Sequence, residues 1–349
     1  MCNNDALGPK KMAKVLPIYD LLNVTMKKFG ILYKNLSVDE SMVPYFGRHS
    51  CKRFIRGKQI RFGFKLWVIS SSTGVPYHVS IYEGKEDGAD NEPLGSRVVK
   101  QAVDACKLSN PHVICDNFFT SCNLIRDLAD KGLSATGTIR KNRVDNCPLP
   151  SVEEMKKMDS GSYANKSDGK VELVRWNDNN VVTLCSNALG VYPLGKAKRW
   201  KKGKYINVDQ PAVIKHYNDC MGGVDLVDRA LSDLRPVIQG KKWYWALFVN
   251  AINLMFVYSW RIYEIAVGKK VQQKQFRDEI VGVLLQVPSE KPSKDSRSGP
   301  GLSIPTPVRY DGKGHYPQDC PVRKCVMCRK SARIQCKKCE KTLHLSICF

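Results

Sequence analysis

Four aspartates in three short acidic segments are the side chains of this sequence best suited to chemistry. Carboxylates gathered in one place repel one another unless divalent cations bind between them. Mg²⁺ or Mn²⁺ held by such oxygens can activate a water or a 3′-hydroxyl on one side of a phosphodiester and stabilise the leaving oxygen on the other. The expected chemistry is therefore cleavage and transfer of nucleic-acid strands. The aspartates concerned are Asp39, Asp116, Asp225 and Asp228.

Each acidic segment is weak evidence by itself, because an aspartate at a strand end is more often a cap or a turn residue. Asp39 and Asp116 end predicted strands. Asp225 and Asp228 are three positions apart, which places them on one face of a helix. The hypothesis therefore depends on a fold that brings two strand ends and one helix together.

The elements between the aspartates follow the order of a ribonuclease H-like mixed sheet, which is an α/β fold. The sequence pattern predicts strands up to Asp39, over 61–70 and over 75–82, with the last two joined as a hairpin across 71–74. Helices over 96–106 and 121–131, the second with Thr120 as candidate N-cap, alternate with strands over 112–115 and 133–140. On such a sheet the strand ends that carry Asp39 and Asp116 are neighbours.

The rest of the chain divides into segments of different composition. Residues 142–205 are polar with short β-like runs, which predicts a β-rich insertion. Helical patterns resume at 211–233 and 243–286, and the following stretch rich in Pro, Ser, Gly and Lys predicts a flexible linker. The predicted organisation is a helical segment at 1–34, the first part of a catalytic domain at 35–141, the insertion at 142–205, the rest of that domain with C-terminal helices at 206–286, a linker at 287–319 and a small zinc-binding module at 320–349.

The six cysteines from Cys320 onward predict metal binding rather than disulfides. Two C-x-x-C pairs, followed by a histidine and a further cysteine, supply the thiolates and imidazole that tetrahedral Zn²⁺ needs. One complete zinc site is predicted, formed either by both pairs or, in a cross-braced arrangement, by the first pair with the last two ligands. The surrounding Lys and Arg favour DNA contact, although charges near a metal site are often only solvated. The candidate ligands are Cys325, Cys328, Cys336, Cys339, His344 and Cys348.

The charge balance predicts an anionic partner, since 56 Lys and Arg against 33 Asp and Glu give a formal net charge of +23. The first residues show no apolar run with a cleavage site, so we expect a reducing compartment rather than secretion. Residues 243–260 are strongly apolar but include Asn250, Asn253 and Ser259, which favours a buried helix over a membrane span. Nucleic acid is therefore the expected partner, and no membrane association is expected.

Two cationic segments are candidate DNA-binding surfaces. The first follows Asp39, where no acidic residue occurs between Glu40 and Glu83, so it would steer phosphate toward the carboxylates. The second mixes cations with Trp200 and Tyr205, as binders of single-stranded or flipped bases do, and it equally fits a nuclear localisation patch. The alternative interpretation of the first segment is that its cations lie on a solvated strand face and bind no DNA. The candidate residues are Arg48, Lys52, Arg53, Arg56, Lys198, Arg199, Lys201 and Lys202.

Several long motifs, in order from about Leu16 to the end, resemble those of the piggyBac transposase family. They are Ser37-Val-Asp-Glu40, Pro44-Tyr-Phe-Gly-Arg48, Cys115-Asp-Asn-Phe-Phe-Thr-Ser121, Tyr217-Asn218 leading to Gly222-Gly-Val-Asp225, the Trp243-rich helix and the paired-cysteine tail. The resemblance implies that Asp39, Asp116 and Asp225 form the metal-binding catalytic triad, with Asp228 as a further required carboxylate. It also implies cut-and-paste transposition in the nucleus, acting on double-stranded DNA with transposon terminal repeats and TTAA targets, in a protein that can form homodimers.

Only 38 residues precede Asp39, whereas the resemblance implies a sizeable N-terminal domain there. Residues 1–34 are therefore expected to be a remnant of a helical dimerisation and DNA-binding domain. The complete acidic set favours an active nuclease, and the short N-terminal segment favours the alternative, a domesticated or truncated DNA-binding or regulatory protein without transposition activity.

Overall fold

The computed structural model describes two compact units, Met1–Lys269 and Lys270–Phe349, each of which has its own fold. The predicted linker over 287–319 lies largely outside the described residues, as do Lys202 and Cys348. The residues described are 11–28, 33–84, 92–106, 110–144, 146–201, 203–238, 240–286 and 311–345.

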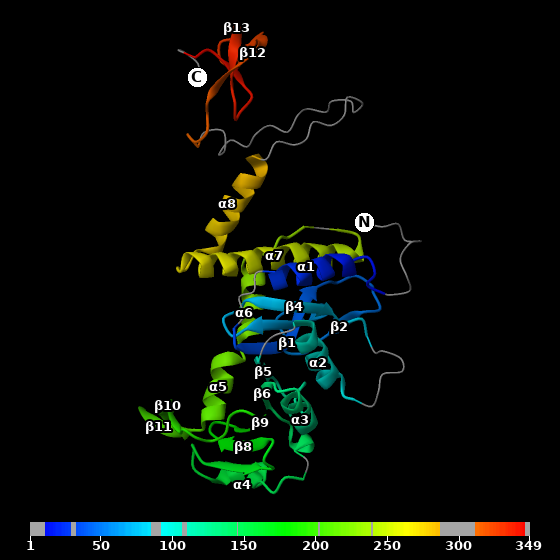
Figure 1. Ribbon diagram of the computed structural model, residues 1–349, viewed down its shortest axis with the longest axis vertical. Helices are drawn as coiled ribbons and strands as arrows, with labels where there is room; N and C mark the ends of the chain where they lie inside the picture. Colours follow the sequence, from blue (N-terminus) through cyan, green and yellow to red (C-terminus); the bar gives the residue numbers. More distant parts are fainter. Residues whose placement is uncertain are drawn as a thin grey trace. The chain divides into compact units, whose positions relative to one another are not determined.

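One nine-stranded mixed sheet organises the first unit (Figure 1), in the order β2-β3-β1-β5-β6-β9-β8-β7 with β4 paired to β3. β1, β5 and β6 run parallel to one another, and the remaining pairs are antiparallel. The large mixed α/β sheet and the hairpin across 71–74 are confirmed. The strands are β1 Asn35–Pro44, β2 Lys52–Phe54, β3 Phe62–Ser71, β4 Pro76–Ile81, β5 His112–Cys115, β6 Ser134–Thr138, β7 Tyr163–Ser167, β8 Glu172–Asn177 and β9 Val181–Ser186.

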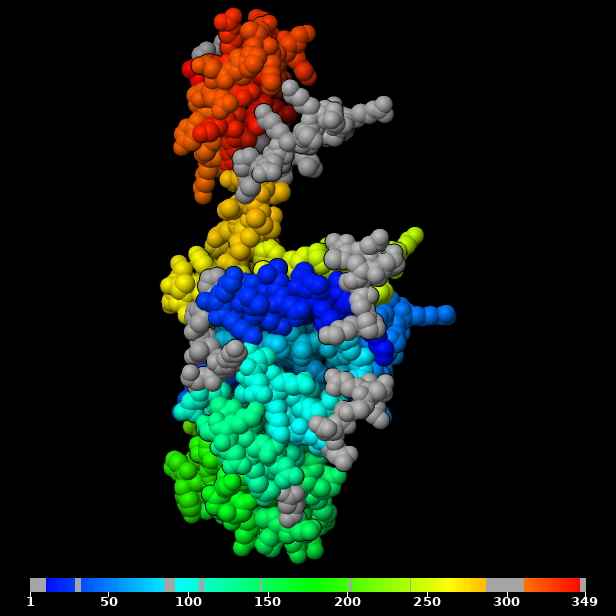
Figure 2. Space-filling view, turned by 45° about the vertical axis from the view of Figure 1, so that its right-hand side comes forward, coloured from blue at the N-terminus to red at the C-terminus, as the bar shows by residue number. Residues whose placement is uncertain are grey.

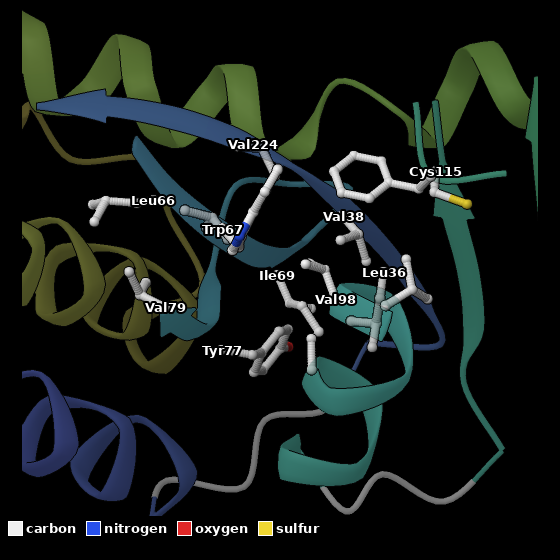
Figure 3. Close-up of a cluster of buried hydrophobic side chains, with 14 of the residues drawn as sticks. Leu36, Val38, Leu66, Trp67, Ile69, Tyr77, Val79, Val98, Cys115 and Val224 are labelled. Carbon is white, nitrogen blue, oxygen red and sulfur yellow. The ribbon is translucent and has the colours of Figure 1, made fainter. Parts of the chain in front are cut away.

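Helices cover both faces of the sheet around β1 and β3. Val98 of α2 packs beside Val38 and Ile69 on one face, whereas Val224 comes from α6, which contacts β1 and β3 from the other (Figure 3). Both faces of these strands are thus buried, as expected where parallel strands join a sheet. The helices of this unit are α1 Leu16–Lys28, α2 Leu94–Cys106, α3 Cys122–Asp130, α4 Val152–Lys157, α5 Ala212–Cys220, α6 Gly223–Asp233 and α7 Trp243–Val267.

The N-cap of α3 is Ser121, and the prediction of Thr120 was wrong. Ser121 has an extended backbone, and its hydroxyl accepts a hydrogen bond from the backbone N–H of Leu124 at 3.1 Å. The Thr120 hydroxyl is instead fully buried and donates to the carbonyl of Asp116 at 2.8 Å. The cap is therefore one residue later because the threonine closes the preceding loop.

The helix α1 is an integral part of the first unit. It packs against β4 and α7, beside which it runs in Figure 1, and Figure 2 shows it in dark blue over the lighter blue and cyan part of the chain. Tyr19, Leu22 and Met26 are buried along it. The Tyr19 hydroxyl donates to the carbonyl of Leu247 at 3.2 Å, and the Tyr258 hydroxyl donates to that of Met26 at 2.9 Å. These contacts fix α1 to the long helix α7.

The helix α7 buries one side along much of its length, including the polar Asn250 and Asn253. Asn253 donates to the carbonyl of Leu231 at 2.9 Å, so its amide is satisfied inside the protein. Among the described helices, none is long and apolar enough to span a bilayer.

The segment predicted as an insertion continues the main sheet, because β9 pairs with β6 and carries β8 and β7 outward. A separate hairpin, β10 Gly195–Lys201 with β11 Lys204–Gln210, covers a second small core around Val174, Trp176 and Leu184. In the second unit, α8 Gln273–Gln286 precedes a three-stranded sheet of β12 Pro317–Lys324, β13 Ser331–Cys336 and β14 Thr342–Leu343.

Candidate active site and metal centres

Asp39 and Asp116 are neighbours on adjacent parallel strands. The last paired positions of β1 and β5 are Val38 and Cys115, and each aspartate comes directly after. Val38 and Cys115 are both fully buried in the core, as Figure 3 shows. Because side chains alternate along a strand, Asp39 and Asp116 lie on the opposite face of the sheet.

The loop after Asp116 is held rigidly. The Asp116 carboxylate accepts a hydrogen bond from the backbone N–H of Phe118 at 2.8 Å. Arg143 donates to the carbonyls of Asn117, Phe118 and Thr120 at 3.0–3.2 Å. The backbone of Gly137 also lies against this loop, since a Cβ there would be 2.1 Å from the Thr120 hydroxyl. The loop therefore keeps the Asp116 carboxylate in one position.

The helix α6 brings the other two aspartates to the same face of the sheet. Its first residue, Gly223, lies so close to the strands that a Cβ would be 2.1 Å from the carbonyl oxygen of Ser71 and 2.5 Å from the hydroxyl of Ser37. One and a half turns later, Asp228 accepts a short hydrogen bond from the Ser41 hydroxyl of β1. Asp225 precedes it on an exposed part of the helix.

The burial of Asp39, Asp116 and Asp228 disfavours the charged form of their carboxyls. It raises the pKa of Asp39 to about 7, despite the nearby Lys58 ammonium. Burial likewise raises the pKa of Asp228 to about 6, although the Ser41 hydroxyl donates to it, and also raises the pKa of Asp116. Such a set of carboxyls either takes up protons or binds cations, so its chemistry fits hard divalent ions.

A lysine from the β2–β3 connection supplies one cation to this cluster. The Lys58 ammonium lies 4.0 Å from Asp39 and 3.7 Å from Glu40. Burial lowers the pKa of Lys58, but the carboxylates of Asp39 and Glu40 outweigh this effect and raise it overall. Within the described ranges, the aspartates do not place three carboxylate oxygens within 4.8 Å of one another. The four aspartates are thus gathered on one face without forming a closed set of ligands.

A cavity of about 510 Å³ adjoins the cluster. Its wall combines both signs of charge, with Asp225 and Asp228 from α6 facing Lys58. Arg229 and Arg235 add two further cations and Asp233 adds a third carboxyl group, so acidic and basic side chains line the cavity in equal number.

The predicted DNA-binding residues occupy different environments. Arg48 and Arg56 are exposed and Lys52 is half-buried, whereas Arg53 packs over the Tyr82 ring at 5.2 Å. On the β10–β11 hairpin, Lys198 is exposed and Arg199 donates to Asp178 at 2.6 Å. The side chains of Lys201 and Lys202 lie outside the described residues. Arg53 and Arg199 are therefore partly committed to contacts within the protein.

The tip of the β10–β11 hairpin presents two aromatic rings to solvent. Trp200 and Tyr205 are 64% and 72% exposed, and their ring centroids are 4.8 Å apart in an edge-to-face arrangement. They pair across the two strands next to the cationic residues.

Among the described residues of the cysteine tail, two groups of cysteine and histidine side chains are candidate metal ligands. Cys325 and Cys328 gather with His344, as in the cross-braced alternative, and Cys348 lies outside the described residues. The second pair, Cys336 and Cys339, gathers instead with His315. In each group the candidate ligand atoms all lie within 4.8 Å of one another. His315 was missed because it stands 21 residues before Cys336 and outside any recognisable ligand spacing.

Each histidine of the tail is oriented by a second hydrogen bond. His315 Nδ1 faces the two thiols at 3.4 Å, and its Nε2 pairs with the Asp311 carboxylate at 3.1 Å. His344 Nδ1 faces Cys328 at 3.3 Å while its Nε2 pairs with the carbonyl of Ser331. A hydrogen bond from the backbone N–H of Cys328 lowers the pKa of Cys325 to about 6, which favours the thiolate. Hydrogen-bond partners such as the Asp311 carboxylate and the Ser331 carbonyl commonly orient metal-bound imidazoles.

Several known proteins are similar to this chain in sequence or in fold. Residues 2–260 match the family model described as Transposase IS4. Human PiggyBac transposable element-derived protein 3 is 36% identical over 99% of this chain, and human PiggyBac transposable element-derived protein 2 is 32% identical over 93%. A cryo-EM structure of a piggyBac transposase synaptic complex with hairpin DNA shares the fold, with a TM-score of 0.65 and 23% identity over 94% of this chain and 71% of that chain.

The family model and the shared fold define a transposase-class protein. The chain belongs to the piggyBac transposase family and is transposase-derived, as its motifs predicted. It spans 60% of the length of the first human relative and 56% of the second.

Proposed function

We propose that the protein is a metal-dependent nuclease and strand-transferase with a ribonuclease H-like catalytic domain. One observation carries the proposal: β1, β5 and α6, far apart in sequence, bring Asp39, Asp116, Asp225 and Asp228 to one face of the sheet. The strand order β4-β3-β1-β5-β6, with three antiparallel strands followed by two parallel ones, supports the ribonuclease H-like assignment.

Asp39, Asp116 and Asp225 would hold Mg²⁺ or Mn²⁺, and Asp228 would support the site through Ser41. The metal supplies activation of the attacking oxygen and neutralisation of charge on the phosphate. The loop fixed by Arg143 orients the Asp116 carboxylate, and the contact of Gly223 with the strands sets the distance between α6 and the sheet. These residues therefore determine the positions of the ligands before DNA arrives.

The proposed partner is double-stranded DNA, with transposon terminal repeats and TTAA sites as the specific targets. The net charge of +23 and the exposed cations beside β1 support DNA binding. The similar solved protein is a transposase in a synaptic complex with hairpin DNA. We extend the proposal to action in the nucleus and to a homodimer, which microscopy of a tagged chain and measurement of its mass in solution test.

The test of catalysis is Mn²⁺-dependent nicking of hairpin and duplex DNA by the purified chain, beside Asp116→Asn. Asparagine keeps the acceptor oxygen for the Phe118 N–H but removes the charge. Nicking that disappears in the variant would support the proposal, whereas equal nicking by both proteins would refute it.

The tail is proposed to bind Zn²⁺ through both of its groups, one ion to each. Cys325, Cys328 and His344 would hold the first, and His315, Cys336 and Cys339 the second. Soft thiolates with imidazole are the ligand set that zinc prefers. Metal analysis of the purified chain should give about two zinc ions, and a metal-free folded tail would contradict the assignment.

A DNA-binding or regulatory role without transposition is the second candidate. The observation that favours it is the open arrangement of the carboxylates, with a lysine ammonium beside Asp39. DNA binding with no nicking under any metal would establish this role in place of the first.

A further inference from the structure

Lys58 is placed at the candidate active site by the connection between β2 and β3. β2 pairs with the beginning of β3, which lies beside Pro44 of β1. From this connection the long Lys58 side chain extends to Asp39 and Glu40. Gly57 has a φ of +92°, a backbone conformation that suits glycine and turns the chain just before the lysine. The Lys58 side chain is 30% exposed, and it lines the cavity of about 510 Å³ beside α6.

The lysine is anchored to Glu40 more closely than to the aspartates. Its ammonium donates to the backbone carbonyl of Glu40 at 3.3 Å and lies 3.7 Å from the Glu40 carboxylate, compared with 4.0 Å from Asp39. An ammonium has three donors, and these contacts do not use all of them in good geometry. Glu40 can therefore retain the lysine when the charge of the aspartates is neutralised.

The neighbouring Lys65 differs from Lys58 in its surroundings. It also pairs with Glu40, at 3.8 Å, but its ammonium lies 3.9 Å from the centroid of the Trp67 ring and 4.9 Å from that of Phe118. These rings cover Lys65, and the cavity beside α6 is lined by Lys58 instead. Of the two lysines, Lys58 is thus the one that faces the space next to Asp225 and Asp228.

We propose that Lys58 contacts the reacting phosphate of DNA, donating a hydrogen bond to one of its non-bridging oxygens, and that Glu40 is its positioning residue. This inference rests on the proposed nuclease function. The ammonium keeps its proton throughout, so its role is to stabilise negative charge on the phosphate rather than to transfer a proton. A donor already fixed in place contributes more to such stabilisation than one that must be ordered during the reaction.

The competing interpretation is that Lys58 is only a counter-ion that keeps the carboxylates from repelling one another. The two interpretations predict different effects of removing the lysine charge. A mere counter-ion becomes dispensable once metal occupies the carboxylates, whereas a phosphate contact is needed most at that stage.

The test uses Lys58→Met and Lys58→Arg in the full chain. Lys131→Met serves as a matched control, because Lys131 also forms an ion pair, with Asp104 at 3.0 Å, at the far end of α3. We expect Lys58→Met to bind Mn²⁺ several-fold more tightly, since a cation beside the carboxylates has been removed. At saturating Mn²⁺ and DNA its nicking rate should fall by about 100-fold, while Lys58→Arg and the control stay within about tenfold of the wild type.

Two outcomes would overturn the proposal. Unchanged Mn²⁺ affinity in Lys58→Met would show that the lysine does not face the carboxylates, and wild-type nicking at saturating Mn²⁺ would leave it as a counter-ion only.

If the wild-type chain nicks no DNA, the proposed function fails by itself, and DNA affinity decides the role of Lys58. Ca²⁺ should then strengthen DNA binding by the wild type relative to EDTA, because Asp39, Asp116 and Asp225 would hold the ion and its charge would attract the phosphate. Loss of most of this gain in Lys58→Met would support the phosphate contact, and an unchanged gain would refute it.

Discussion

Replacing Gly223 with alanine should displace the helix that carries Asp225 and Asp228. The added Cβ would lie 2.1 Å from the carbonyl oxygen of Ser71, where ordinary contact begins at 3.4 Å. The obstacle is backbone on a central strand, so the helix has to move by about 1.3 Å, the difference between these two distances. Overpacking of this kind costs about 1–3 kcal/mol, and a displacement of about 1 Å at a catalytic group can reduce the rate by about 100-fold.

Gly222 provides the matched control, because a Cβ at this adjacent position meets no atom within 4 Å. Thermal unfolding should show Gly223→Ala melting lower by about 2–4 °C for each kcal/mol lost, with Gly222→Ala close to the wild type. Nicking at saturating Mn²⁺ should fall only in Gly223→Ala. Equal stability and equal nicking of the two variants would refute the close approach of α6 to the strands.

Three further perturbations test other parts of the molecule. Burial lowers the pKa of His112 to about 4, so its neutral form stabilises the fold above about pH 6.5. This stability is lost as the pH falls toward 4, by up to about 1.4 kcal/mol per pH unit. The free energy of unfolding in denaturant should therefore differ less between pH 7 and pH 5 in His112→Gln than in the wild type, and an identical difference would contradict the assignment. His315→Ala should reduce the zinc content by about one ion per chain by metal analysis, whereas unchanged content would remove His315 from the ligands. Trp200→Ala should weaken DNA binding by roughly tenfold in a fluorescence titration through the loss of base stacking. Tyr192→Ala serves as the control, because Tyr192 is also a largely exposed aromatic residue, and equal affinities of the two variants would exclude the hairpin tip from the DNA interface.

The sequence was most informative where local pattern and packing agree. The strand His112–Cys115 was predicted with its observed bounds, because four consecutive apolar or buried positions between turn residues suit a strand covered on both faces. In contrast, β1 was predicted to end at Asp39 but extends to Pro44. Polar residues after Asp39 suggested a strand end, but the strand continues because α6 supplies a partner for them: the Ser41 hydroxyl donates a hydrogen bond to Asp228.

The zinc groups show the same limit of local reasoning. The two C-x-x-C pairs were visible because both ligands of a pair sit on one tight turn. The histidine of each group comes from another part of the tail. The pairing of β12 with β13 brings His315 to the second pair, and β14 brings His344 to the first. The spacing of the cysteines could therefore suggest alternatives without choosing between them.

Two glycines connect the fold to the candidate site in a way that the acidic motifs alone do not reveal. Gly137 lies on β6 next to the loop that comes after Asp116, and Gly223 lies on α6 against β1 and β3. In both places a side chain would collide with backbone and with a buried hydroxyl group. The close approach of these backbones helps to set the separation between the aspartates, and either protons or bound cations offset the repulsion between their carboxylates. The proposed metal site would therefore depend on how tightly the strands and α6 pack.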